Sequence, residues 1–132
     1  MTTQTRSGPA VGERRLNSPV ALASGAVFVL LGLAGFLMPA SGYAAGPDGF
    51  QLTMLLNVLH VAVGAALVAA GILGARQATL VNTAVGVASI TLVVVGLSVT
   101  GTGTTPTGID LPHLVLGLAL TAVGLCGDRP SH

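Results

Sequence analysis

The sequence predicts an all-α membrane protein in which four transmembrane helices form an up-down-up-down bundle. Two observations lead to this fold class. Only 7% of the 132 residues are charged and 52% are hydrophobic, whereas a soluble domain carries about 25% charged residues. The apolar residues also gather in four nearly uncharged runs, each close to the ~17–25 residues that cross a ~30 Å hydrocarbon core as a helix. Four spans leave too little chain for a separate soluble domain.

The four spans follow one another within a transmembrane domain at 18–128, and they are expected at about 19–38, 52–74, 79–99 and 110–127. The first run is longer than the ~7–15 apolar residues of a signal peptide, so it is expected to be a true span. Residues 1–17 show no apolar periodicity and predict a disordered cytoplasmic tail, with a second short tail at 129–132. The fourth run is the shortest, and Asp110 at its start is expected near the membrane interface.

The arginines predict the orientation of the spans. All five fall in segments that the four spans place on the same side of the membrane: Arg6, Arg14, Arg15, Arg76 and Arg129. The segments 39–51 and 100–109, on the other side, contain no lysine or arginine. By the positive-inside rule, the chain is a multi-pass protein of the cell membrane with both termini in the cytoplasm.

Composition and motifs narrow the classes of partner and chemistry. A net charge of +1 gives no electrostatic footprint for nucleic acid. The glycines near residue 101 lack the lysine of a phosphate-binding loop, and no nucleophile-elbow motif occurs. No catalytic residue and no metal ligand set are therefore assigned. The expected partners are the lipid bilayer and, within it, copies of this chain or other membrane proteins.

A polar motif opens both the second and the fourth span. A shift of 53 residues, from 57 to 110, aligns the two copies, which read Asn57-x-x-His60-x-x-x-Gly64 and Asp110-x-x-His113-x-x-x-Gly117. Weaker similarity relates the first and third spans, where Gly25 and Gly35 correspond to Gly86 and Gly96. Corresponding spans run in the same direction, so this pattern indicates a parallel tandem repeat of two helical hairpins.

Helical periodicity places the polar residues of each motif on one face together with small residues. Glycines at such spacing let membrane helices approach closely, so these positions are expected to be packing sites: Gly25, Gly32, Gly64, Gly71, Gly117 and Gly124. The polar residues should then face the bundle interior in the outer half of the bilayer, as one buried cluster: Asn57, His60, Asp110 and His113.

Four interpretations of this cluster are open. Its members could satisfy one another's hydrogen bonds and fix the helix register. His60 and His113 could instead hold a cofactor, either haem b between two axial imidazoles or a metal ion. The titratable groups could relay protons or a small solute. The cluster could also serve other chemistry at the outer face.

The same residues carry a resemblance to a known family. Gly35-Phe36 ends the first span, Asn57-Val58-Leu59-His60 with Gly64 opens the second, and Asp110-Leu111-Pro112-His113 with Gly117 opens the fourth. Over about 18–127 the chain resembles the domain of unknown function 4383 family of small four-helix actinobacterial membrane proteins. The resemblance implies an integral membrane protein without an assigned activity. The expected function is thus a non-enzymatic accessory or scaffold component, with a bis-histidine binding protein or a transport protein as alternatives.

Overall fold

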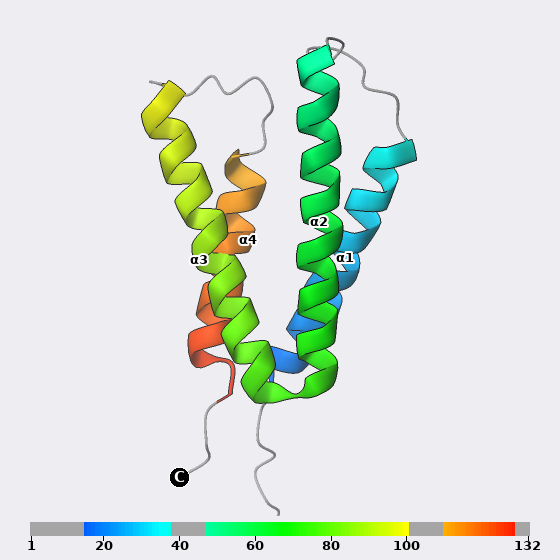
Figure 1. Ribbon diagram of the computed structural model, residues 1–132. Coiled ribbons are helices and arrows are strands. Elements are labelled where there is room, and N and C mark those ends of the chain that lie inside the picture. The colour runs from blue at the N-terminus through cyan, green and yellow to red at the C-terminus, as the bar shows by residue number, and fades with distance from the viewer. Residues whose placement is uncertain (1–14, 38–46, 101–109, 129–132) are drawn as a thin grey trace, which may run out of the picture.

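The computed structural model describes residues 15–37, 47–100 and 110–128 (Figure 1). In these residues the fold is all-α, as predicted, with four helices: α1 (Asn17–Leu37), α2 (Pro47–Leu73), α3 (Ala75–Thr100) and α4 (Asp110–Cys126). Most of the tail predicted at 1–17, and the tail predicted at 129–132, lie outside the described residues.

Three of the helices are long and apolar enough to cross a membrane, over Asn17–Leu37, Met54–Leu73 and Ala75–Gly96. The apolar part of α4, Leu111–Cys126, is shorter. At 1.5 Å per residue the 17 residues of α4 measure ~25 Å, somewhat less than the ~30 Å hydrocarbon core.

The turn between α2 and α3 is a single residue. Gly74 has a φ of 119°, a left-handed conformation that side chains with a Cβ rarely adopt. This glycine ends α2, and α3 begins directly after it at Ala75. The predicted span 52–74 therefore covers α2 from its sixth residue to the turn, and the predicted span 79–99 lies within α3.

The helices pair into two hairpins, α1 with α2 and α3 with α4. Glycines lie where the paired helices cross. A Cβ built on Gly25 would lie 2.7 Å from the carbonyl oxygen of Gly64, and one on Gly86 would lie 2.7 Å from the carbonyl oxygen of Gly117. Only glycine permits so close an approach of two backbones.

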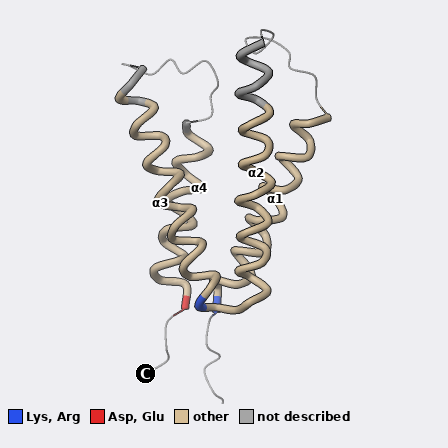
Figure 2. Tube along the Cα trace, viewed as in Figure 1, with Lys and Arg blue, Asp and Glu red and all other residues tan. Residues whose placement is uncertain are grey.

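The two hairpins meet at one end of the molecule and diverge toward the other (Figure 1). We call the end that holds the Gly74 turn the base, and the opposite end the open end. Ala21, Phe28, Leu67 and Ala78 form the apolar core that joins the hairpins. The backbones of α2 and α4 do not come into contact in the described residues. Figure 2 shows the described arginines and an aspartate together at the base.

Candidate binding site between the two hairpins

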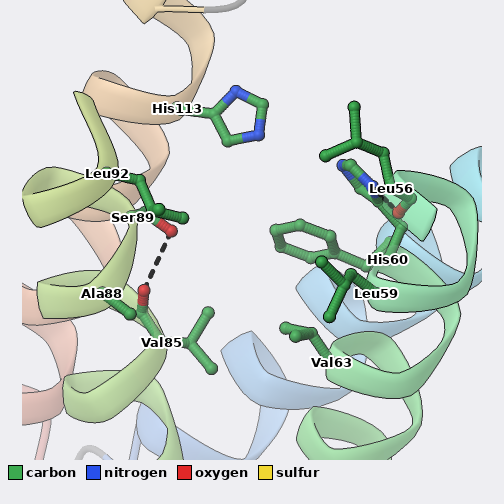
Figure 3. A pocket seen from close by; sticks show the side chains of 10 residues that line it. Leu56, Leu59, His60, Val63, Val85, Ala88, Ser89, Leu92 and His113 are labelled. Atoms are coloured by element: carbon green, nitrogen blue, oxygen red, sulfur yellow. Dashed lines mark hydrogen bonds between the residues drawn. The ribbon is translucent and has the colours of Figure 1, made fainter. Parts of the chain in front are cut away.

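The divergence of the hairpins leaves a cleft above the core. Its cavity measures about 140 Å³, and Figure 3 shows its walls coming from α2 on one side and from α3 and α4 on the other. Most lining residues are apolar: Phe28, Leu56, Leu59, Val63, Val85, Ala88 and Leu92. The polar members of the lining are Ser89, His60 and His113.

His60 is held in a defined orientation on the α2 wall. Its Nδ1 atom lies 2.7 Å from the carbonyl oxygen of Leu56, one helical turn earlier. A carbonyl oxygen only accepts hydrogen bonds, so Nδ1 carries the proton and donates it. In the neutral ring Nε2 then presents its lone pair. The ring also packs against Phe28, with 5.5 Å between the ring centres.

His113 projects into the cleft from the opposite wall. It lies in the first turn of α4, directly after Pro112, where a proline costs no helical hydrogen bond because the first N–H groups of a helix have no partner within it. The rings of His60 and His113 face each other across the cleft (Figure 3), with centres 6.0 Å apart and planes inclined by 76°. Both residues are half-buried.

The other two residues of the predicted cluster are placed differently. Asn57 is half-buried and lies over Gly35 of α1, because a Cβ on that glycine would collide with the Asn57 amide. Asn57 thus packs inside the first hairpin. Asp110 is the first residue of α4, and its side chain lies outside the described residues.

All six glycines predicted to pack helices are buried: Gly25, Gly32, Gly64, Gly71, Gly117 and Gly124. Each faces the neighbouring helix of its own hairpin. A Cβ on Gly71 would meet the Leu22 side chain at 2.7 Å, and one on Gly124 would meet the Thr83 backbone nitrogen at 2.9 Å. The glycine face and the histidines therefore have different neighbours, since the glycines face within the hairpins and the histidines face the cleft.

The buried polar cluster lies at the base instead of the open end. Asn17 is 1% exposed and Asn82 is 0% exposed. The Asn82 amide nitrogen donates to the backbone carbonyl of Asn17 at 3.1 Å and to its side-chain oxygen at 3.2 Å. The backbone N–H of Asn17 in turn donates to a carboxylate oxygen of Asp128 at 3.2 Å. We call these three residues the basal clasp.

The basal clasp joins three helices and corrects the expectation of one buried polar cluster made by the repeated motif. Asp128 follows α4 and caps the first turn of α1, while Asn82 reaches over from α3. The sequence contains one signal for it, because Asn82 is an isolated amide within an apolar run. Its partners are distant in sequence and belong to no repeat, so only the folded chain identifies them.

These features define the class of protein. Over residues 15–37, 47–100 and 110–128 the chain is all-α, with three helices of membrane-spanning length and a shorter apolar helix, and the helices pair as two hairpins. Its sequence matches a family described as a domain of unknown function (DUF4383) over residues 19–127, and the chain belongs to that family. No curated protein and no solved structure matches it.

Proposed function

We propose that this chain is a multi-pass protein of the cell membrane that serves as a non-enzymatic accessory or scaffold component of a membrane complex. The observation that carries this proposal is the apolar outer surface. Large apolar side chains stay exposed on every helix, for example Leu31 (57%) on α1, Ile72 (72%) on α2, Leu80 (62%) on α3 and Leu125 (69%) on α4. Such surfaces suit lipid and the helices of other membrane proteins.

The construction of the hairpins supports a role in assembly. Each hairpin is held by close glycine contacts between its own two helices. The hairpins join at the base, so much of their length is left to neighbouring molecules in the membrane. Helices associate in membranes by packing and by interhelical hydrogen bonds, without a hydrophobic drive between them. The exposed faces of the two hairpins are surfaces on which the helices of other membrane proteins can pack.

Measuring the mass of the complex extracted from its native membrane tests the scaffold proposal. The expected particle, isolated in mild detergent, has a protein mass well above the 13.0 kDa of one chain. Particles that contain one chain and no other protein, at several detergent concentrations, would overturn the proposal. Cross-linking in the intact membrane before extraction is the control for dissociation by detergent.

We also propose that all four helices cross the membrane, with both termini in the cytoplasm. Arg15 forms a backbone β-bridge with Asp128, and Arg76 lies in the first turn of α3 beside the Gly74 turn, so the arginines that the structure describes lie at the base, where Figure 2 shows basic and acidic residues together. That end is the cytoplasmic one by the positive-inside rule. A reporter fused after His132 should be active only if it is one that works in the cytoplasm. A cysteine introduced in 39–51 should react with an impermeant reagent from outside, and an external C-terminus would exclude four crossings.

A tandem repeat of hairpins is part of the same proposal. The contacts that support it are equivalent in the two halves. Gly64 faces Gly25 as Gly117 faces Gly86. One helix pairing is therefore built twice, and a parallel repeat related by an axis along the membrane normal accounts for it.

A bis-histidine haem site is the second candidate function. The 6.0 Å between the ring centres of His60 and His113 favours it, because axial imidazoles on either side of an iron have a similar spacing. The size of the cleft opposes it. A cavity of about 150 Å³ holds benzene, so the 140 Å³ between these walls would have to widen considerably for a macrocycle. An absorption spectrum of the purified protein decides, since haem gives a Soret band that should disappear in His60→Ala, and a colourless protein excludes it.

A further inference from the structure

The histidine pair has the geometry of a site for a bare metal ion. We propose that His60 and His113 bind one first-row transition-metal ion, of the Zn²⁺ or Cu²⁺ type, through one nitrogen of each ring. The ion would bridge the two hairpins across the cleft. This inference goes beyond the scaffold function and is independent of it, because a chain that assembles with partners need not bind metal.

The spacing of the rings fits a shared ion. With metal–nitrogen bonds of about 2.0–2.1 Å, the centre of an imidazole lies ~3.2 Å from the metal. Two rings on one ion then have centres ~5.2 Å apart at a tetrahedral angle and ~6.4 Å apart at a linear angle. The observed 6.0 Å between His60 and His113 lies inside this interval.

The hydrogen bond of His60 prepares that ring for a metal. Metal-binding histidines donate the second ring N–H to a carbonyl or carboxylate, which fixes the tautomer and the ring orientation. The Nδ1 atom of His60 makes this bond to the Leu56 carbonyl at 2.7 Å. The nitrogen that remains for an ion is Nε2. Phe28 packs beside the same ring and further restricts its rotation.

The surroundings select the class of ion. Imidazole suits zinc, copper, iron and nickel, whereas magnesium and calcium require oxygen ligands. The cleft walls are mostly aliphatic, which limits the access of bulk water to the bound ion. No group of three or more histidine, cysteine, aspartate or glutamate residues gathers within the described ranges. The ion therefore keeps open positions for water or a small ligand that enters from the cleft.

A bridging ion should also hold the hairpins together at the open end. His60 lies on α2 and His113 on α4, and the backbones of these two helices do not come into contact. An ion bound to both histidines would connect the two hairpins near the open end, whereas the apolar core connects them nearer the base. Because such an ion binds the folded state, it raises the unfolding temperature by mass action.

Metal titration of the tag-free, full-length protein in lipid nanodiscs tests the proposal. Zn²⁺ should bind with one ion per chain and raise the unfolding temperature. Affinity should fall by at least ~10-fold in His60→Ala and in His113→Ala, as loss of a ligand requires. His132→Ala is the matched control, because it removes the remaining histidine of the chain, and it should bind Zn²⁺ as the wild type does.

Spectroscopy of the wild-type protein tests the metal site without any variant, and so does not depend on whether a variant folds. Electron paramagnetic resonance of bound Cu²⁺ should show coupling to two imidazole nitrogens. Coupling to one nitrogen or none would overturn the proposal, as would equal Zn²⁺ affinity in wild type and both cleft variants. One ion per two chains would overturn it as well. None of these results bears on the mass of the native complex, so the scaffold function is judged separately.

Discussion

Inside each hairpin the helices touch backbone to backbone, whereas between the hairpins they meet through a few side chains at one end. Gly25 and Gly64 bring α1 and α2 together, and Gly86 and Gly117 do the same for α3 and α4. The contact between the hairpins consists of a small apolar core and the basal clasp. The histidine cleft lies beyond this contact, toward the open end.

The difference shows two ways in which apolar helices are joined within one small chain. Glycine contacts gain dispersion energy where the two helices of a pair cross and expose no polar group. Polar side chains occur where the hairpins meet. Asn17 and Asn82 at the base are buried and bonded to each other, so they serve the fold. In the cleft, His60 and His113 are half-buried and line a cavity, so they are the polar side chains there that a ligand would meet.

Gly64→Leu is expected to have the largest effect, because it attacks a contact inside a hairpin. A Cβ at this position would lie 2.7 Å from the carbonyl oxygen of Gly25, which is backbone and cannot rotate away. Overpacking costs about 1–3 kcal/mol and sometimes more, and a leucine here should reach the upper end of that range. Thermal unfolding in mild detergent measures the loss. Ala69→Leu is the control, since Ala69 is exposed on the same helix. Equal stability of the two variants would contradict the glycine contact.

Asn82→Leu should have the next largest effect, because it removes the clasp between the hairpins. The change leaves the backbone carbonyl and the side-chain oxygen of Asn17 without the donor they share. An unsatisfied buried polar group costs about 1–3 kcal/mol. The side-chain oxygen of Asn82 has no hydrogen-bond partner, and its removal offsets part of that cost. A net loss of ~1–2 kcal/mol is therefore expected.

The control for this variant is Thr91→Val on the same helix, whose exposed hydroxyl bonds only to the Val87 carbonyl of its own helix. It should change the unfolding temperature little. If Asn82→Leu unfolds at the same temperature as Thr91→Val, the basal clasp does not hold the hairpins together. The contact between the hairpins would then depend on the apolar core alone.

The histidine pair should contribute less than the clasp in the metal-free protein. An edge-to-face ring pair is worth about 0.5–1.5 kcal/mol, and both rings are half-buried. If the two rings are in contact, either single variant already removes that contact, and the second substitution in the double variant removes nothing further from it. The double variant His60→Ala with His113→Ala should therefore cost less than the sum of the single variants. Unfolding of all four proteins with a chelator present measures the coupling. Strict additivity would show that the two residues do not meet.

Gly96→Ala should have the smallest effect and one of opposite sign. A Cβ at Gly96 would meet no atom within 4 Å, although the corresponding Gly35 of the first hairpin is covered by Asn57. Alanine favours a helix over glycine by up to ~1 kcal/mol, so Gly96→Ala should leave stability unchanged or raise it slightly. Gly35→Ala should lower it. A loss of stability in Gly96→Ala would show that the two hairpins pack alike at the open end.

Much of the fold follows from the sequence because lipid imposes simple requirements. A helix must satisfy its own backbone, so four apolar runs predict four helices. The positions of the glycines likewise predict the faces that pack. The pairing of His60 with His113 was open to prediction because the repeated motif puts both residues in the outer half of their predicted spans, His60 eight residues after the start of 52–74 and His113 three residues after the start of 110–127. The position of a residue along its span indicates its depth in the bundle, and two residues at similar depths lie at a similar height on neighbouring helices.

Periodicity alone does not decide which helices become neighbours. The motif assigns Asn57 and His60 to one helical face, yet Asn57 packs on α1 and His60 faces the cleft. When two other helices flank one face of a helix, neighbouring residues on that face can contact different helices. The basal clasp is a stronger case, since Asn17, Asn82 and Asp128 come from three separate segments of the chain.

The sequence by itself determined the all-α class, the approximate course of four apolar helices and the glycine faces. These properties depend on composition and on residues within one or two helical turns of each other. Only the tertiary structure decided that the hairpins diverge, that a cleft lies between them and that the buried polar cluster is at the base. These depend on the angle at which two preformed units meet, which is set by contacts such as Asn82 with Asn17 that join residues far apart in the chain.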